Sequence, residues 1–317
     1  MAHPIHQATK NSPFGDLTKE EFYHKHHVIH QDSFMLNNHN MRIYTQTWRP
    51  AEQNAPCGLV AMIHGYASES SWLFQLTAVA IAKLGFLVCA IDLRGHGYSD
   101  GRRGHIPAVA PVVDDCVQFF DSVKSSNASL PSFLYGESLG GAIAILVYLK
   151  QKSNWDGMVL NGAMCGVSAK FKPPWPLEKF LPAAACVAPS WRVVLRKSLM
   201  QKSYKEEWKR ELVRRSPRAQ ASENPPASTA LELIRICKEI GRRSEELELP
   251  MLVLHGEEDV VCDLDSAELV YELAKSKDKT LKIVYAMWHQ LIGEDKDTVE
   301  MGFEVIFSWL KERAKRA

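Results

Sequence analysis

The sequence carries almost no net charge, because 38 lysines and arginines are balanced by 37 aspartates and glutamates. This balance argues against a broadly basic surface of the kind that captures nucleic acid. The chain has no run of about eighteen apolar residues, so the sequence predicts no membrane-spanning helix. The seven cysteines contain no Cys-x-x-Cys pair, which disfavours a zinc ribbon or a redox motif.

The first residues lack the apolar core of a secretory signal peptide. The cysteine count is odd, and several cysteines lie in apolar runs, as Cys89 does in Leu87–Ile91. Unpaired thiols inside a core are typical of a reducing compartment. We therefore expect a cytoplasmic protein.

Signals for a metal or a cofactor are weak. The glycines of the run Asp92–Asp100 have neither the G-x-x-G extension nor the GK[ST] ending of a phosphate loop. No HExxH motif occurs, and the cluster of His24, His26, His27 and His30 is predicted to be a solvated face, although helical spacing could bring His26 and His30 together. We expect neither a metal nor a cofactor.

Hydrophobic residues make up 46% of the chain and charged residues 24%, the composition of a globular protein. Short unbroken apolar runs alternate with helical patterns, which predicts an α/β fold: one mostly parallel sheet with helices on both faces. Residues 41–48 alternate in polarity and are a candidate antiparallel edge strand. The predicted strands are 58–63, 86–91, 133–135, 157–160, 251–254 and 281–285, and the predicted helices are 71–84, 111–125, 139–151, 263–275 and 299–314.

The strand pattern is missing from residues 164–228, which contain eight prolines and three tryptophans. Strands are predicted on both sides of this stretch, so it is expected to be an insertion into one domain. We predict a core formed by residues 1–163 and 229–317, with 164–228 as an inserted helical cap.

The sharpest motif is Gly136-Glu137-Ser138-Leu139-Gly140, which follows a predicted strand and opens a predicted helix. A serine on such a turn is exposed at the carboxyl end of the strand, and the glycines allow strand and helix to approach closely. This context favours Ser138 as a nucleophile over a serine that merely caps a helix.

A serine nucleophile needs a base, and the base needs an acid that orients it. Asp259 follows the strand 251–254 and is the preferred acid. His289 follows the strand 281–285 and is the candidate base. The order serine, acid, histidine is the one expected for this architecture. Nearby alternatives for the acid are Glu257, Glu258, Asp263 and Asp265.

Acyl transfer also requires hydrogen-bond donors for the developing oxyanion. The backbone N–H of Leu139 at the start of a helix is one candidate, and that of Tyr66 in the loop after an early strand is the other. His64 precedes the nucleophile in the chain and is therefore interpreted as structural.

These motifs resemble the α/β-hydrolase superfamily and, within it, the monoacylglycerol lipases, particularly the plant branch that includes caffeoylshikimate esterases. The resemblance extends from about residue 21 to residue 313. The segments that carry it are His64-Gly65-Tyr66, the run Asp92–Gly101, Gly136–Gly141, Asn161–Cys165, Lys172–Pro176, His255-Gly256 leading to Asp259, and Trp288–Leu291.

The resemblance implies that Ser138 is the nucleophile, Asp259 the acid and His289 the base, with the oxyanion bound by the amides of Tyr66 and Leu139. It implies a cap over the acyl pocket, and in monoacylglycerol lipases this cap is apolar and touches membranes. Cys262 matches a cysteine near the site of lipase relatives, with an inert loop cysteine as the alternative. Aromatic and sulfur side chains in or beside the cap are further candidates for the pocket, with helix packing as their alternative role: Trp175, Trp191, Trp208, Met287 and Trp288.

We therefore expect a serine carboxylic-ester hydrolase acting on a small-molecule ester. Monoacylglycerols and aromatic esters of the caffeoylshikimate or benzyl type are both candidate substrates. A small-molecule receptor built on the same fold is an alternative. An acyltransferase is another, although Glu69 stands where the HxxxxD motif counted from His64 has aspartate. Peripheral membrane contact through the cap and the oligomeric state stay open.

Overall fold

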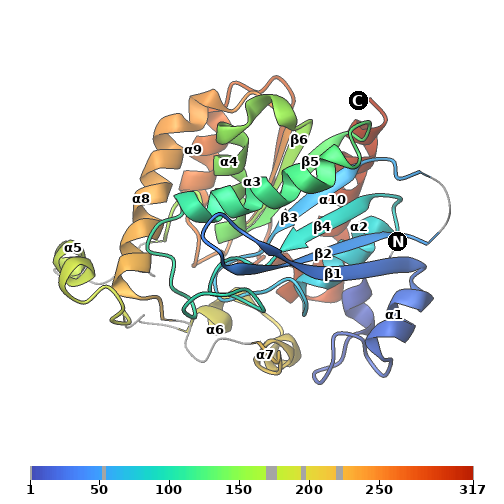
Figure 1. Cartoon of the computed structure of the whole chain (residues 1–317), viewed down its shortest axis with the longest axis horizontal. Coiled ribbons are helices and arrows are strands. Elements are labelled where there is room, and N and C mark those ends of the chain that lie inside the picture. Colours follow the sequence, from blue (N-terminus) through green and yellow to red (C-terminus); the bar gives the residue numbers. More distant parts are fainter. Residues whose placement is uncertain (1, 52–54, 169–176, 194–197, 219–223, 317) are drawn as a thin grey trace.

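The computed structural model describes residues 2–51, 55–168, 177–193, 198–218 and 224–316 (Figure 1). Its centre is an eight-stranded sheet in the order β1-β2-β4-β3-β5-β6-β7-β8. All pairs from β4 to β8 are parallel, whereas β1 and β2 pair antiparallel with their neighbours. The strands are β1 (Val28–Leu36), β2 (Arg42–Pro50), β3 (Leu59–Ile63), β4 (Leu87–Ile91), β5 (Ser132–Glu137), β6 (Gly157–Asn161), β7 (Met251–Gly256) and β8 (Lys279–Val284).

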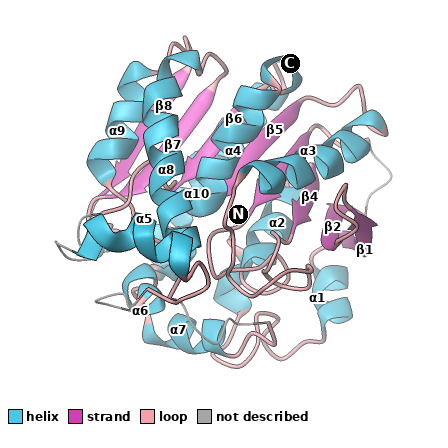
Figure 2. Ribbon diagram, turned by 60° about the vertical axis from the view of Figure 1, so that its left-hand side comes forward, coloured by secondary structure: helices cyan, strands magenta, loops and turns pink. Residues whose placement is uncertain are grey.

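Helices cover both faces of the sheet (Figure 2). One layer contains α3 (Ala110–Ser125), α4 (Leu139–Lys150), α8 (Ala227–Arg243) and α9 (Leu264–Leu273). The other contains α1 (Lys19–Lys25), α2 (Phe74–Ala82) and α10 (Lys296–Ala314). The expected α/β class is therefore confirmed.

Alternating side chains of each central strand enter opposite cores. Ala61 and Ile63 of β3 pack under α3 and α4, whereas Val60 and Met62 pack under α2 and α10. All five residues of β3 are buried. Strands that are buried on both faces read as unbroken apolar runs, which is why the sequence predicted them.

The prediction of an edge strand at 41–48 was wrong, because β2 lies inside the sheet between β1 and β4. The edge on this side of the sheet is β1, in which polar residues 30–33 divide the apolar residues into two short groups and most residues are exposed or half-buried. The predicted solvated histidine face is confirmed for His24 and His27, which are exposed, and wrong for the other two histidines. α1 ends at Lys25, so His26 is buried against Phe22, while His30 belongs to β1 and bonds to Gln46.

The segment predicted as a cap contains three helices in its described parts: α5 (Leu177–Val187), α6 (Leu199–Ser203) and α7 (Glu207–Arg214). α5 packs against α8 and projects to the far left of the view in Figure 1. The cap boundaries at 164 and 228 stay a prediction. No helix within the described ranges is long and apolar enough to cross a bilayer.

The turn between β5 and α4 is fixed by close backbone packing. A Cβ on Gly140 would lie 2.0 Å from the carbonyl oxygen of Ile63, and a Cβ on Gly136 would lie 2.4 Å from that of Gly140. Neither contact can be relieved by rotating a side chain. Glycine is therefore required at both positions to bring α4 against β3 and β5.

We predict that Gly140→Ala lowers the free energy of unfolding by about 2–3 kcal/mol, because the added methyl group overlaps backbone atoms. Gly241→Ala in α8 is the matched control, since its new Cβ would meet no atom within 4 Å. The control should gain roughly 0.5–1 kcal/mol from helix propensity. Urea denaturation measures both variants, and equal stabilities would contradict the steric argument.

Candidate active site

Ser138 occupies the turn that ends β5 and begins α4. Its backbone has φ 54° and ψ −121°, a conformation that non-glycine residues rarely adopt. The cost of such a conformation is on the order of 1–3 kcal/mol and is met by the surrounding packing. The result is a serine hydroxyl held at the carboxyl edge of the parallel sheet.

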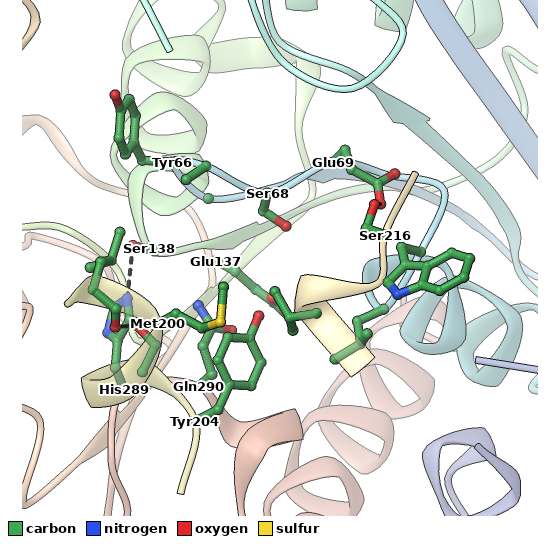
Figure 3. Close-up of a pocket in the computed structure, with 17 residues that line it drawn as sticks. Tyr66, Ser68, Glu69, Glu137, Ser138, Met200, Tyr204, Ser216, His289 and Gln290 are labelled. Atoms are coloured by element: carbon green, nitrogen blue, oxygen red, sulfur yellow. Dashed lines mark hydrogen bonds between the residues drawn. The ribbon is translucent and has the colours of Figure 1, made fainter. Parts of the chain in front are cut away.

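The structure brings Ser138, His289 and Asp259 into one chain of hydrogen bonds. His289 Nε2 lies 2.9 Å from Ser138 Oγ, and His289 Nδ1 lies 2.7 Å from Asp259 Oδ2. Figure 3 shows the His289 ring facing Ser138. The three residues follow β5, β7 and β8, so the carboxyl ends of parallel strands gather residues that are up to 151 positions apart.

The carboxylate of Asp259 is well supplied with donors. Its Oδ1 accepts hydrogen bonds from the amides of Val261 at 2.7 Å and Cys262 at 3.0 Å. Its Oδ2 also lies 3.3 Å from Nε2 of the fully buried His255. Burial by itself raises the pKa of Asp259, but His289 and His255 outweigh it and hold that pKa below the ordinary value. Asp259 therefore stays ionised beside the imidazole.

The alternative acids have other partners. Glu257 accepts from the amide of Ala286, and Glu258 accepts from the indole of Trp288. Asp263 caps the N-terminus of α9 through the amide of Ser266. Among the described acids, only Asp259 is bonded to His289.

The loop after β3 lies directly against Ser138. A Cβ on Gly65 would be 3.0 Å from Ser138 Cβ, so this close approach requires glycine. Ala67, two residues on, has a positive φ of 60°. The Tyr66 hydroxyl bonds to the carbonyl oxygen of Gly104, and its ring points away from Ser138 (Figure 3). No described residue accepts a hydrogen bond from the amides of Tyr66 or Leu139.

His64 faces the opposite direction from the relay. It is fully buried, its Nε2 accepts from the amide of Leu93 at 3.0 Å, and its Nδ1 lies 2.8 Å from the carbonyl oxygen of Gly65. Burial lowers the pKa of His64 to about 4. Both ring nitrogens are thus engaged in the loop, which agrees with the structural interpretation of this histidine.

A cavity of about 820 Å³, part of which is open to solvent, opens onto Ser138 and His289 (Figure 3). Its apolar wall is formed by two residues just before α2 and by residues of α6 and α7: Trp72, Leu73, Leu199, Met200 and Val213. Its polar side includes Ser68, Glu69, Glu137, Ser203, Tyr204, Ser216 and Gln290. The cavity thus combines an apolar wall with two carboxyl groups.

The tryptophans and Met287 were poor guides to this cavity. Trp191 is 74% exposed, and Met287 is fully buried in the core under α10. Trp208 and Trp288 donate their indole N–H groups to Glu206 and Glu258. None of these four lines the cavity, because their rings serve packing or surface hydrogen bonds. Trp175 lies outside the described residues.

Cys262 lies beside the relay without lining the cavity. Its sulfur and ligand atoms of Asp259 and His289 lie within 4.8 Å of one another, a spacing that a metal ion could use. However, the carboxylate and the imidazole already bond to each other, and burial raises the pKa of the Cys262 thiol. Metal binding would require breaking that bond and ionising the thiol.

Sequence reasoning missed the carboxyl groups of Glu137 and Glu69. Glu137 is adjacent to the nucleophile in the motif, so its position was the available signal. Oε1 accepts from Tyr135 at 2.6 Å, and Asn161 contributes a longer contact at 3.4 Å. Burial raises the pKa of Glu137 to about 7. Glu69 accepts from Ser71 and Ser216, and burial next to Asp92 raises its pKa to about 7 as well.

The cap segment holds the loop that carries His289. The amide of Gln290 donates to the carbonyl oxygen of Ser203 at 2.9 Å. The ammonium group of Lys205 donates to the carbonyl oxygen of Ala286 at 2.8 Å and lies 3.4 Å from Glu294. Lys209, only 1% exposed, donates to the carbonyl oxygen of Glu294. Glu294 in turn accepts from the amide of Trp288 at 2.6 Å.

Comparison with protein families matches residues 54–296 to the family described as "Serine aminopeptidase, S33". The chain is 30% identical to caffeoylshikimate esterase of Arabidopsis thaliana, across 96% of this chain and 92% of that protein. It is also 30% identical to human monoglyceride lipase, across 89% of this chain and 91% of that protein.

Solved structures support the same fold. A monoglyceride lipase of Saccharomyces cerevisiae in complex with a substrate analog superimposes with a TM-score of 0.78 at 19% identity, covering 90% of this chain and 95% of that one. The monoacylglycerol lipase of Paleococcus ferrophilus gives a TM-score of 0.72 at 20% identity, covering 86% of this chain and 99% of that one.

We predict that Glu137→Gln flattens the dependence of stability on pH between about 4.5 and 7. The folded protein keeps the Glu137 proton in this range, whereas the unfolded chain loses it, so stability falls as pH rises. The loss from this one group reaches roughly 3 kcal/mol above pH 7. Urea unfolding at pH 5 and pH 7.5 measures it. An unchanged pH difference in the variant would contradict the assignment, and the exposed Glu312→Gln is the control.

We predict that Lys209→Met lowers the kcat for a simple ester by roughly 10-fold, as expected when a supporting contact of a catalytic group is lost. KM should change less, because Lys209 does not line the cavity. Arg214→Met on the same helix is the control, since Arg214 pairs only with Glu207 and Glu211 among the described ion pairs. Equal kcat values for both variants would contradict a role for Lys209 in holding the loop.

Proposed function

The chain belongs to the serine aminopeptidase S33 family, and from this premise we propose that it hydrolyses carboxylic esters through an acyl-enzyme formed on Ser138. The observation that carries the proposal is the continuous hydrogen-bonded chain from Ser138 through His289 to Asp259. The relatives named as esterase and monoglyceride lipases belong to the same reaction class.

In the first step, Ser138 Oγ attacks the ester carbonyl while His289 Nε2 accepts the serine proton. The distance of 2.9 Å between these atoms is within the range for direct proton transfer. The ionised Asp259 orients the imidazole through its Nδ1 hydrogen and stabilises the imidazolium that forms. His289 then protonates the departing alcohol.

The negative oxygen of the tetrahedral intermediate needs donors that are already in place. The amides of Tyr66 and Leu139 are our candidates. The close approach of Gly65 to Ser138 and the position of Leu139 as first residue of α4 support this assignment. The helix N-terminus adds a favourable partial positive charge.

In the second step, His289 removes a proton from water, and the hydroxide attacks the acyl carbonyl. Collapse of this second intermediate releases the acid and returns the proton to Ser138. The same three residues thus serve both halves of the reaction. We propose no cofactor in either step.

The substrate is proposed to be a small ester with an apolar or aromatic acyl group. The apolar wall of the cavity suits such a group, and the polar side suits hydroxyl groups. The identity of 30% to both a caffeoylshikimate esterase and a monoglyceride lipase supports either acyl class equally. Membrane contact through the cap is a further part of the proposal: the exposed Phe180, Val187 and Trp191 could provide it.

An acyltransferase that uses the His64 motif receives no support from the geometry. Both nitrogens of His64 are engaged in the loop, and His64 does not line the cavity. Glu69, at the motif's acid position, bonds to Ser71 and Ser216 instead. A receptor would bind an ester without rapid multiple turnover, so turnover separates it from the proposed enzyme.

We predict that Ser138→Ala lowers turnover of 4-nitrophenyl butyrate and of monoacylglycerol by roughly 10⁴–10⁶-fold, the scale of lost triad members. Steady-state hydrolysis by the purified wild type and variant measures this change. Near-normal activity in the variant would exclude Ser138 as the nucleophile. A single slow turnover in the wild type would instead favour the receptor.

A further inference from the structure

The cavity at Ser138 carries acidic groups without a basic partner. Glu137 and Glu69 line it, whereas no lysine or arginine does so among the described residues. Glu137 lies between Ser138 and the pair Glu69–Ser216 in Figure 3. Part of any ester that reaches Ser138 through this cavity must therefore lie close to a carboxyl group.

Glu137 has one oxygen available to a bound molecule. Both of its hydrogen bonds, from Tyr135 at 2.6 Å and from Asn161 at 3.4 Å, arrive at Oε1. No described residue donates a hydrogen bond to Oε2, although Glu137 is only 6% exposed. Glu137 lines the cavity, and a carboxyl oxygen without a protein donor is an acceptor for a hydroxyl group. It also repels an anion.

Four cations of the cap segment have partners other than Glu137 and Glu69. Lys205 pairs with Glu294 at 3.4 Å, and Lys209 lies 3.6 Å from Glu206. Lys202 lies over the ring of Trp288, and Arg218 over that of Tyr98. Among the titratable groups, His289 is the one whose charge lowers the pKa of Glu137, and burial outweighs it. The described cap cations therefore do not neutralise this carboxyl group.

We propose that Glu137 makes the enzyme select esters whose alcohol part is hydroxylated but uncharged, and reject esters whose alcohol part carries a carboxylate. This inference rests on the proposed hydrolase function of Ser138. It distinguishes between the two substrate classes, because a glycerol ester is neutral whereas a shikimate ester is an anion. Glu69, whose oxygens bond to Ser71 and Ser216, adds to the negative potential of the cavity.

The expected size of the effect follows from Coulomb's law. Two carboxylates about 6 Å apart at an effective dielectric constant of ~20 repel strongly enough to change a rate constant on the order of 10- to 100-fold. Burial raises the pKa of Glu137 to about 7, so the carboxylate form dominates at pH 8.5 and the neutral acid at pH 6. The rejection of an anion should therefore be stronger at pH 8.5.

The test compares three esters of one acyl group with the full-length enzyme: the 1-ester of glycerol, the 3-ester of glycerate and the same ester of methyl glycerate. The glycerate ester differs from its methyl ester only in its charge. The acyl group is octanoyl or caffeoyl, whichever the wild type cleaves faster from glycerol. The measured quantity is the ratio of kcat/KM for the methyl glycerate ester to that for the glycerate ester.

We expect this ratio to be at least 10 at pH 8.5 for the wild type and to fall at least 5-fold in Glu137→Gln. The glutamine can still accept from Tyr135, which preserves the internal hydrogen bond. Glu312→Gln, which removes an exposed charge on α10, is the matched control and should keep the wild-type ratio. If Glu137→Gln does not fold, the wild type decides the test, because its ratio should shrink between pH 8.5 and pH 6. Titrations that change only the reactivity of the site affect both esters alike and cancel from the ratio, whereas Glu69, whose pKa burial also raises to about 7, contributes to the change.

Each outcome decides the proposal. A wild-type ratio near 1, or a ratio that Glu137→Gln does not reduce, would overturn the charge selection while hydrolysis lost in Ser138→Ala leaves the proposed function intact. If the variant does not fold, a wild-type ratio that pH 6 does not reduce has the same meaning. Absence of any hydrolysis that depends on Ser138 would overturn both the function and this inference.

Discussion

The hydrogen bond between His289 Nε2 and Ser138 Oγ is the contact on which the proposed chemistry depends. Its two partners are 151 positions apart in the sequence. Ser138 is fixed by a backbone turn whose glycines pack against β3, and His289 is fixed by Asp259 on one side and by the cap segment on the other. The cap segment near α6 and α7 therefore supports the catalytic loop as well as lining the cavity.

Several groups in this region are held at a cost in stability. Ser138 has a strained backbone, and Glu137 and Glu69 are carboxyl groups whose burial raises their pKa values. If these three residues had no function, substitutions that remove the strain and the buried carboxyl groups would stabilise the fold. Their position next to the nucleophile agrees with a site that needs preorganised acceptors, and it connects the stability of the protein to its choice of ester.

The predictions from the sequence were most accurate for the buried strands and for the motif residues that follow strands. The central strands were predicted because both faces of each are buried, and Ser138 and Asp259 each follow such a strand. His289 follows the edge strand β8, which is only partly buried. β1 was not predicted, because polar residues 30–33 divide its apolar residues into two short groups. The cavity was also missed. Tryptophans in or beside the cap were used as its sign, but Trp208 and Trp288 bond to carboxylates and Trp191 is exposed. Met200, Tyr204 and Ser216 line the cavity without belonging to a motif.

The most direct test of the relay is covalent labelling of the wild type and His289→Ala with a fluorophosphonate, followed by peptide mass spectrometry. A serine that is activated by an adjacent base reacts rapidly with such a reagent. The account predicts an adduct on Ser138 in the wild type and labelling at least 100-fold slower in His289→Ala, on the scale of general-base catalysis. An adduct on another residue, or equal labelling rates in the two proteins, would contradict it.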